Sequence, residues 1–286
     1  MKFFIKNFER FKRLLLNSYF KDNVIKCSFR FGLWYIFKLI KKSRITIRIF
    51  NTIKLELMID NSLKLGVHGY TFVYRGMLDP LVPISLDKYI SKGDFVLDIG
   101  ANFGLWSFKM SELIGDEGRV YAFEPFPKNI RFFKKNILLN NSKNIVLHEL
   151  ALGDSNTFLT IHEGIDLGST SLLKTNDSKF SSESEVIEIR VLDEFTFDKR
   201  ITFIKLDVEG FEMFVLKGMQ NVITQNRPII AIEINREQLL ASGFVPKDII
   251  DFFNPYNYRI FKLSGNREVE IQSFEEDNDY LLKPIF

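Results

Sequence analysis

The sequence has 286 residues, of which 46% are hydrophobic, and a formal net charge of only +3. This length and apolar content suffice for a full hydrophobic core, in one large domain or in one domain with an extension, and they exclude a disordered chain. The single cysteine, Cys27, excludes an internal disulfide and a cysteine-based zinc site. A reducing compartment such as the cytoplasm fits this cysteine usage best.

Membrane-spanning and secretory segments are not predicted. No stretch reaches the roughly 18 to 20 apolar residues that cross a bilayer, and the longest candidate, residues 31–40, contains Lys38. Charges at Lys6, Glu9 and Arg10 interrupt the position where a secretory signal needs its apolar segment. We therefore expect a cytoplasmic protein.

The excess positive charge lies in residues 1–48, which contain thirteen lysines and arginines but only two acidic residues. Phe4, Phe8 and Phe11 recur at steps of three and four, which predicts one or two basic amphipathic helices. Such helices pack on the domain that follows or on a second subunit, or they lie on an anionic membrane surface, here the inner face. Nucleic-acid binding is less favoured, because no aromatic RNA-recognition signature accompanies the charge.

Residues 44–60 alternate between apolar and polar side chains and predict a pair of strands. The glycines in residues 66–76 predict a loop-rich lead-in, and a short helix is expected over residues 84–90. We therefore interpret residues 1–90 as a basic N-terminal extension of helices and strands, and residues 91–286 as the main domain.

The stretch FVLDIGANFG, residues 95–104, predicts a strand, a tight turn and then a helix. Glycines at positions 100 and 104 let the backbone approach a ligand closely, and the free N–H groups of the helix start point at that ligand. Nucleotide-like cofactors use such turns, although α/β proteins also contain them without a ligand. The spacing differs from the dinucleotide fingerprint G-x-G-x-x-G, which argues against NAD.

Strands and helices then alternate along the chain. Strands are predicted at residues 119–123, 144–150, 201–206 and 229–234, each followed by helical sequence. Apolar strands alternating with helices indicate an α/β fold with a mostly parallel sheet covered on both faces. Ligands of such sheets bind at the carboxyl ends of the strands.

Residues 154–192 break this alternation. They are rich in serine and threonine and are flanked by the alternating runs TFLTI and VIEIRV, which predict an inserted hairpin with a long polar tip. Loops of this length are uncommon in compact domains unless they have a function. The insertion is therefore either a lid or substrate-contact element, or a plain surface excursion.

Glu124 ends the second predicted strand, in YAFEP, beside the glycine turn. A carboxylate at this place can accept both hydroxyl protons of a ribose. An exposed acid at a strand end is the alternative, but the combination with the glycine turn is more specific than either feature alone. We therefore expect a nucleoside-binding platform, with adenine near the end of the third strand.

The fourth predicted strand ends in IKLDVEGFEMFVLKG, which contains Lys205, Asp207, Glu209 and Glu212. Lys205 and Asp207 lie on the same side of the strand by its period of two. Charges at the end of a central strand are costly unless they pair with each other or serve a function. We expect a direct catalytic or metal role for at least one of them, and Glu233 at the end of the fifth strand projects toward the same place.

Four sequence blocks, VLDIGANFG, YAFEPFPKNI, ALGD and IKLDVEGFEMFVLKG, resemble in order and spacing the motifs of the FkbM family of S-adenosylmethionine-dependent methyltransferases. The resemblance covers about residues 92–233, with an extension to residue 284, and is slight in the first 90 residues. It implies a Rossmann-like class I methyltransferase fold, with a mostly parallel seven-stranded sheet and helices on both faces.

The resemblance also implies how S-adenosylmethionine is held. The glycine turn holds the methionyl part, and Glu124 holds the ribose hydroxyls. Related enzymes often place an acidic side chain near the adenine amino group; this chain has apolar residues there, so that backbone groups or Asp154 would serve. The implied cofactor-binding residues are Asp98, Gly100, Ala101, Asn102, Gly104, Glu124, Pro125, Ala151, Leu152 and Asp207.

Methyl transfer requires a nucleophile held in line with the methyl group, exclusion of water, and a proton acceptor when a hydroxyl is attacked. Asp207 and Glu209, with Lys205 beside them, are the candidate catalytic residues that orient and deprotonate the acceptor. His162 in the insertion is an alternative base. His148 is a second alternative, although its mid-strand position favours a packing role.

A divalent metal held by Asp207 and Glu233 is an equally tenable way to activate the hydroxyl. The family resemblance implies O-methylation of a sugar, a glycan precursor or another small molecule. An RNA methyltransferase and a membrane-associated nucleoside-binding module without catalysis are the alternatives. The sequence leaves the oligomeric state open.

Overall fold

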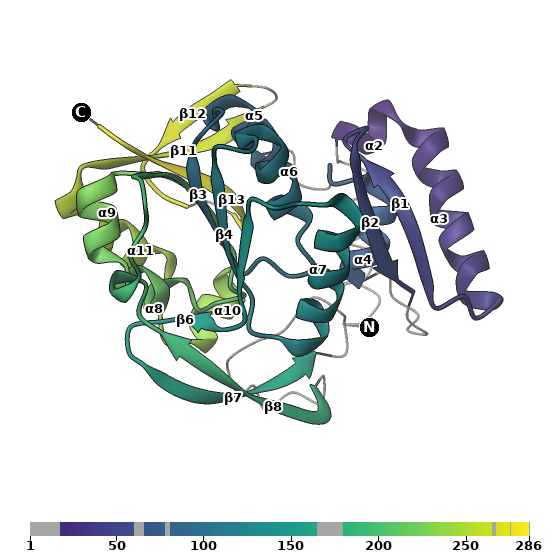
Figure 1. Cartoon of the computed structure of the whole chain (residues 1–286). Helices are drawn as coiled ribbons and strands as arrows, with labels where there is room; N and C mark the ends of the chain where they lie inside the picture. The colour runs from purple at the N-terminus through teal and green to yellow at the C-terminus, as the bar shows by residue number, and fades with distance from the viewer. Residues whose placement is uncertain are drawn as a thin grey trace, which may run out of the picture. The chain divides into compact units, whose positions relative to one another are not determined.

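Figure 1 shows a computed structural model of the chain, which describes residues 18–59, 66–77, 81–164, 180–264, 267–274 and 276–285. By its internal contacts the chain divides into two compact units, Met1–Pro80 and Leu81–Phe286. The expected division into residues 1–90 and 91–286 stays a prediction. None of the helices in the described ranges combines the length and apolarity that crossing a bilayer requires.

The first unit contains a two-stranded antiparallel sheet, in which Arg44 lies opposite Met58 and Ile49 opposite Ile53. Alternate side chains of both strands are buried, so the predicted pair of strands is confirmed. The prediction of helices in residues 1–48 is confirmed for 18–39, while residues 1–17 lie outside the described ranges. The elements are α2 (Ser18–Asp22), α3 (Val24–Leu39), β1 (Arg44–Ile49), β2 (Ile53–Met58) and α4 (Gly66–Tyr74).

Helix α4 lies where the glycines predicted a loop-rich lead-in, and that prediction is wrong. The helix buries Phe72, Val73 and Tyr74, and the ring of Phe72 lies 5.4 Å from that of Trp34 on α3. Packing of these apolar side chains outweighs the low helix propensity of glycine, which amounts to about 1 kcal/mol per residue.

The second unit is built on an eight-stranded sheet with the order β12-β11-β13-β10-β9-β3-β4-β5. Strands β5, β4, β3, β9 and β10 pair in parallel, and β13 pairs antiparallel with both β10 and β11. Because β13 is antiparallel to both of its neighbours, β11 points in the same direction as the parallel strands. The strands are β3 (Phe95–Ile99), β4 (Arg119–Phe123), β5 (Ile145–His148), β9 (Ile201–Leu206), β10 (Ile229–Ile234), β11 (Tyr258–Ser264), β12 (Arg267–Ile271) and β13 (Asn278–Pro284).

The expected fold class is therefore confirmed, with one more strand than the seven predicted. Strand β12 is the addition; it pairs only with β11, at the edge of the sheet. Helices α6 and α7 lie on one side of the sheet and α8, α9 and α11 on the other (Figure 1). The helices are α5 (Leu81–Tyr89), α6 (Leu105–Ile114), α7 (Pro127–Asn140), α8 (Glu212–Lys217), α9 (Gln220–Asn226), α10 (Arg236–Ala241) and α11 (Pro246–Phe253), with short 3₁₀ turns η1 (Leu192–Glu194) and η2 (Asn254–Tyr256).

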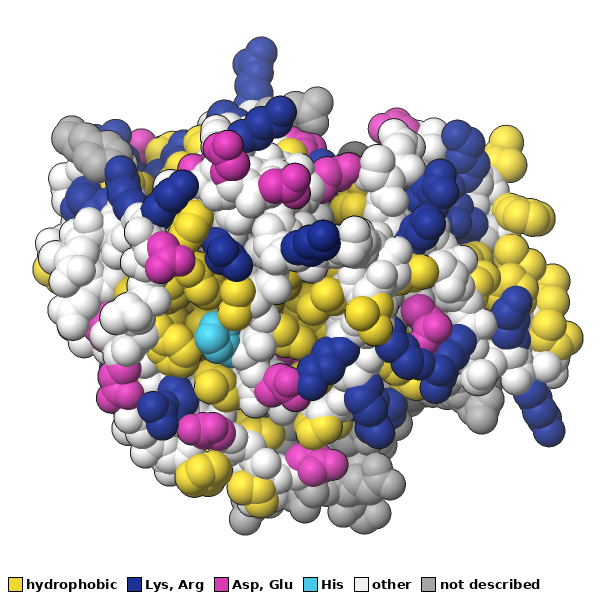
Figure 2. Space-filling view, viewed as in Figure 1, with side chains coloured by type: hydrophobic (Ala, Val, Ile, Leu, Met, Phe, Trp, Pro, Cys, Tyr) yellow, Lys and Arg dark blue, Asp and Glu magenta, His cyan; other side chains and the backbone are white. Residues whose placement is uncertain are grey.

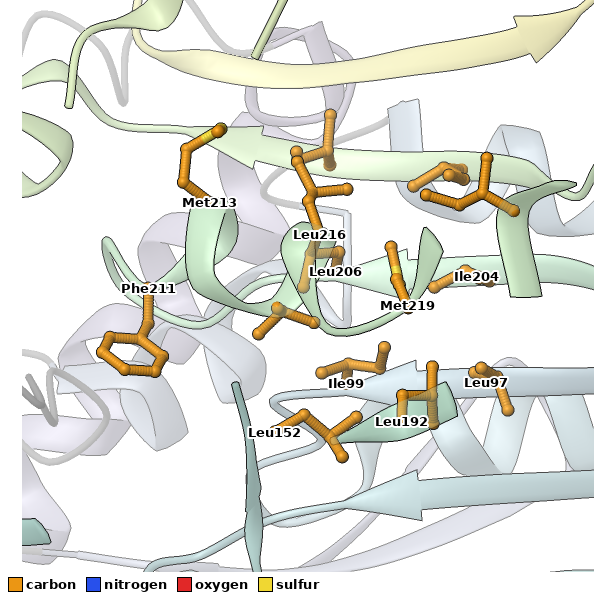
Figure 3. Packing of buried hydrophobic residues seen from close by; sticks show 14 of the residues in the cluster. Leu97, Ile99, Leu152, Leu192, Ile204, Leu206, Phe211, Met213, Leu216 and Met219 are labelled. Carbon is orange, nitrogen blue, oxygen red and sulfur yellow. The ribbon is translucent and has the colours of Figure 1, made fainter. Parts of the chain in front are cut away.

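The core of the unit lies between the central strands and the helices that follow β9. All five residues of β3 are buried, as a strand covered on both faces requires. Figure 3 shows Ile99 of β3 and Leu206 of β9 in one apolar cluster with Leu216 and Met219, and all four side chains are 1% exposed or less. This packing fixes the carboxyl ends of β3 and β9 next to each other.

The predicted inserted hairpin is confirmed. Strands β7 (Thr157–Gly164) and β8 (Phe180–Arg190) pair antiparallel, and β6 (Ala151–Leu152) adds a third strand beside β8. Ile187 and Ile189 on its inner face are buried in the same core cluster as Phe211, just after β9. The hairpin therefore packs at its base against the carboxyl end of the main sheet, while residues 165–179 of its predicted polar tip lie outside the described ranges.

Candidate functional site

The glycine turn is fixed between the ends of two neighbouring strands. The N–H groups of Gly100 and Ala101 both donate to the carbonyl of Phe123 at 3.0 Å, and the N–H of Asp207 donates to the carbonyl of Ile99 at 3.0 Å. Gly100 has a φ of 82°, and a Cβ there would lie 1.8 Å from the Asp207 carbonyl oxygen. Only glycine fits this place, because any side chain would separate β3 from the end of β9.

Two buried acceptor oxygens of the turn have no hydrogen-bond partner among the described residues. They are Oδ1 of Asp98, whose side chain is fully buried, and Oδ1 of Asn102, whose backbone is left-handed with a φ of 52°. The other oxygen of Asp98 accepts from the Ser107 hydroxyl. Burial raises the pKa of Asp98, opposed by the ammonium of Lys205. Unpaired buried acceptors favour a ligand that brings hydrogen-bond donors, such as an ammonium group.

Gly104 begins helix α6 with a φ of 94°. The rings of Phe108 and Phe133 fill the space beside it, each with an atom less than 3.0 Å from where a Cβ would lie. This glycine therefore lets the aromatic packing reach the turn, and its expected contact with the methionyl group stays a prediction.

Glu124 follows β4 and is 5% exposed. One carboxylate oxygen accepts the N–H of Asn102 at 2.8 Å, and the other accepts the N–H of Phe126 at 2.9 Å and the amide of Asn129 at 3.2 Å. Burial raises the pKa of Glu124 to about 7, although these hydrogen bonds favour its charged form. The hydrogen bond from Asn102 thus joins the glycine turn directly to the acid at the end of β4. Asn129 on α7 was not predicted, because a single polar residue in a helix gives no signal.

The residues expected near adenine are less accessible. Ala151 and Leu152 form β6, and their side chains are 6% and 2% exposed in the apolar core. Asp154 is exposed and accepts a hydrogen bond from the hydroxyl of Ser155 at 3.3 Å. Pro125 is half-buried beside Glu124. The adenine contacts of these residues stay predictions.

His148 closes β5 rather than lying in mid-strand, because the strand ends at residue 148 and not at 150. Its ring stacks on Phe123 with centroids 4.7 Å apart and meets Phe195 edge-on at 5.2 Å. Burial lowers the pKa of His148, which favours the neutral imidazole. This aromatic packing supports the structural role that the sequence favoured. The side chain of His162, the other candidate base, lies outside what the structure describes.

The end of β9 carries a buried ion pair. The ammonium of Lys205, which is 3% exposed, lies 2.7 Å from a carboxylate oxygen of Asp207, and Asp98 occupies the paired position on β3. Burial alone would lower the pKa of Lys205, but the carboxylates of Asp207 and Asp98 outweigh it and hold that pKa above its ordinary value. Burial alone would raise the pKa of Asp207, but Lys205 and a hydrogen bond with Glu233 hold it low.

Asp207, Glu209 and Glu233 each offer a carboxylate oxygen, and these three oxygens lie within 4.8 Å of one another. We call these residues the carboxylate cluster. Burial and the charge of Asp207 raise the pKa of Glu209 to about 8, and Asp207 together with burial raises the pKa of Glu233 well above its ordinary value. The cluster therefore holds protons at neutral pH, with Asp207 as the ionised member. Glu209 has a left-handed φ of 54° and accepts from the side chain of Gln238 on α10, which the sequence did not predict.

Glu212 does not belong to the cluster. Its Oε1 accepts the N–H groups of Val208 at 3.3 Å and Gly210 at 3.1 Å, so it holds the turn that presents Glu209. Burial raises the pKa of Glu212 to about 7. From the sequence we expected Glu212 among the charged residues with a possible catalytic or metal role. Helix α8 begins at Glu212, and its carboxylate instead binds the backbone of the preceding turn.

These residues fit S-adenosylmethionine. The unpaired oxygens of Asp98 and Asn102 match a cofactor ammonium, and Glu124 is an acceptor held at the end of the neighbouring strand. A divalent cation also has suitable oxygen ligands in the carboxylate cluster, but the ammonium of Lys205 already neutralises Asp207. The structure therefore supports the cofactor site more strongly than a metal site.

Known proteins with similar sequences are methyltransferases. A protein described as Methyltransferase 1 from Beauveria bassiana (strain ARSEF 2860) is 29% identical over 147 residues, which cover 44% of this chain and 59% of that protein. Protein-L-isoaspartate O-methyltransferase from Aeropyrum pernix is 32% identical over 103 residues, covering 36% of this chain and 37% of the relative. The chain thus spans less than two thirds of the length of either curated relative.

Among solved structures, the methyltransferase FkbM from Methylobacillus flagellatus KT aligns over 75% of this chain and 54% of its own, with 18% identity and a TM-score of 0.43. The sequence model of the family described as Methyltransferase FkbM domain matches residues 98–260, which is 163 of the 286 residues. The match includes the glycine turn, Glu124, the fourth-strand block and Glu233. The chain therefore belongs to the FkbM domain family of S-adenosylmethionine-dependent methyltransferases.

Proposed function

We propose that this protein transfers the methyl group of S-adenosylmethionine to a hydroxyl oxygen of a sugar, a glycan precursor or another small molecule. The observation that carries the proposal is the position of the carboxylate cluster, which begins at Asp207 directly beside the glycine turn. A proton acceptor is thus held next to the residues that fit the methyl donor. Bound S-adenosylmethionine supplies a methyl group made electrophilic by its sulfonium.

The residues of this chain provide the positioning and the proton transfer. The acceptor hydroxyl oxygen forms a bond to the methyl carbon as the carbon–sulfur bond breaks, and the hydroxyl proton passes to a carboxylate of the cluster. Glu209 suits this role because its pKa of about 8 lies near the working pH, where a general base is most effective. Asp207, ionised by Lys205, raises the pKa of Glu209 through its charge and so favours transfer of the hydroxyl proton to Glu209.

Carbohydrate and other small-molecule acceptors are what the family resemblance implies, and a carboxylate base suits a hydroxyl. Nitrogen acceptors that are neutral amines need no such base before attack, because the proton can leave afterwards. The presence of carboxylates that can act as a base at this place therefore favours oxygen as the acceptor atom.

The test is formation of S-adenosylhomocysteine with panels of free sugars, nucleotide sugars, lipid-linked glycans and, as the alternative acceptor class, RNA. Transfer to a carbohydrate or small-molecule hydroxyl is expected. Transfer to RNA alone, or cofactor binding without turnover on any panel, would contradict the proposal and favour the RNA methyltransferase or the non-catalytic module.

Variants then test the base on the acceptor found. Asp207→Asn is expected to keep the Kd of S-adenosylmethionine within about threefold while kcat falls by about a hundredfold or more. Glu209→Gln is expected to lower kcat and to remove the rise in rate as the pH passes through about 8. The exposed Glu117→Gln, at the opposite end of β4, is the matched control and should change neither value. Full activity of both cluster variants would show that the cluster is not the base.

A further inference from the structure

Helix α3 exposes a stripe of large apolar side chains to solvent. Among the described residues fourteen large hydrophobic side chains are exposed, and seven of these lie between Val24 and Ile40. Isolated exposed hydrophobics are ordinary in a protein, but a concentration on one helix marks an interaction site. Five of them form what we call the α3 stripe: Ile25 (85% exposed), Phe29 (70%), Ile36 (52%), Leu39 (81%) and Ile40 (64%).

The spacing places the stripe on one face of the helix. At 100° per residue, its five members fall within an arc of roughly 100°. Gly32 lies within the same arc, and a Cβ added there would meet no atom of the described residues within 4 Å. No described residue therefore covers the middle of the stripe.

The opposite face anchors the helix in the first unit. Cys27 and Trp34 are 0% and 1% exposed, and the guanidinium of Arg30 donates to the carbonyl of Val73 on α4 at 3.1 Å. Trp34 also packs on Phe72. Because this inner face is fixed by packing and a hydrogen bond, α3 has no freedom to rotate the stripe inward.

Positive charge flanks the stripe. Between residues 18 and 44 there are seven lysines and arginines but a single acid, Asp22. By helical spacing Lys26 borders the stripe, whereas Lys38 lies on the inner side with Cys27 and Trp34. Lys41 and Lys42 follow the end of the stripe and are exposed. Figure 2 shows hydrophobic side chains along α3, at the right of the view, with Lys and Arg side chains among them.

We propose that the α3 stripe docks this protein on an anionic lipid surface, with the helix lying in the plane of the interface. An apolar face bordered by lysines is what such a helix requires, since the hydrocarbon accepts the apolar side chains and the phosphates attract the lysines. A second copy of this chain fits less well, because two stripes would bring fourteen positive charges together against two acids. The inference concerns the first unit and goes beyond the proposed methyl transfer.

The test uses the full chain and vesicle flotation, without cofactor or acceptor. Binding is expected to vesicles of phosphatidylcholine with 30% phosphatidylglycerol, to fall by at least about tenfold on pure phosphatidylcholine, and to weaken in high salt. The double variant Ile25→Gln, Phe29→Gln is expected to lose at least about tenfold in partitioning. Leu138→Gln is the matched control, because Leu138 is 82% exposed but lies on α7 in the other unit.

A second measurement locates the helix in the membrane. An environment-sensitive fluorophore on Phe29→Cys should shift to the blue on anionic vesicles, whereas the same fluorophore on Leu138→Cys should not. Cys27 is buried and should not compete for the label. Unchanged flotation of the double variant, no shift at position 29, or a stripe-dependent dimer in solution without lipid binding would each overturn the inference.

Discussion

Replacement of Glu124 tests the cofactor site most specifically. In the free protein its carboxylate accepts three hydrogen bonds, at 2.8, 2.9 and 3.2 Å, and the two ribose hydroxyls would add two more donors. A hydrogen bond to a charged group contributes about 1.5 to 3 kcal/mol. Glu124→Ala should therefore weaken S-adenosylmethionine binding by roughly 10- to 150-fold, which is that energy converted to Kd.

Isothermal titration calorimetry with S-adenosylmethionine measures this change, and circular dichroism confirms that the variant is folded. Glu117→Ala, an exposed acid in the turn before β4, is the control and should bind as the wild type does. An unchanged Kd for Glu124→Ala would refute the ribose assignment.

The pH dependence of S-adenosylmethionine binding is a second test of the contact between Glu124 and the ribose. The pKa of Glu124 is about 7 in the free protein, and hydroxyl donors favour the charged carboxylate. Affinity should therefore fall as the pH decreases below 7, approaching tenfold per pH unit, and Glu124→Gln should remove most of this dependence. Affinity that is constant from pH 5.5 to 8 in the wild type would contradict this account of Glu124.

Three further predictions concern stability and metal dependence. Gly100→Ala should lower the free energy of unfolding by about 1 to 3 kcal/mol more than Gly93→Ala in chemical denaturation, because both glycines have a φ of 82° but only Gly100 lies against another strand; equal losses would refute the close approach. The raised pKa of Glu124 means that the folded protein keeps a proton that the unfolded chain releases. The contribution of protonated Glu124 to the free energy of unfolding is therefore complete below about pH 4.5 and is lost as the pH rises to 7. In urea titrations, the free energy of unfolding of Glu124→Gln should rise by about 1 kcal/mol or more relative to that of the wild type between pH 5 and pH 7. The same dependence of this free energy on pH in both proteins would contradict the account. Chelation by EDTA should leave turnover unchanged, since Lys205 neutralises Asp207; loss of activity that Mg²⁺ or Mn²⁺ restores would instead assign a metal to the carboxylate cluster.

The parts of the fold that sequence reasoning predicted correctly are those with strong local patterns. The apolar strand and glycine turn at residues 95–104 and the alternating runs of the hairpin both have the predicted form, because hydrophobic periodicity reports burial directly. Helix α4 was missed, because its glycines signal a loop and its helical state depends on packing against α3. Strand β12 was missed because five partly exposed residues at a sheet edge have little pattern of their own.

The site divides in the same way. Asp207, Glu209 and Glu233 were predicted to converge, since the carboxyl ends of parallel strands meet at one edge of a sheet. The contacts of Asn129 and Gln238 were not predictable, because each depends on where a helix places one polar side chain. Glu212 was grouped with the cluster by its nearness in sequence, whereas its hydrogen bonds to Val208 and Gly210 direct it to the backbone.

The most direct test of the central claim is a crystal structure of the protein with S-adenosylhomocysteine. The account predicts the ribose hydroxyls within hydrogen-bonding distance of Glu124, the ammonium group at the free oxygens of Asp98 and Asn102, and the sulfur directed toward Asp207. A product molecule bound away from the glycine turn, or a ribose that makes no contact with Glu124, would contradict it.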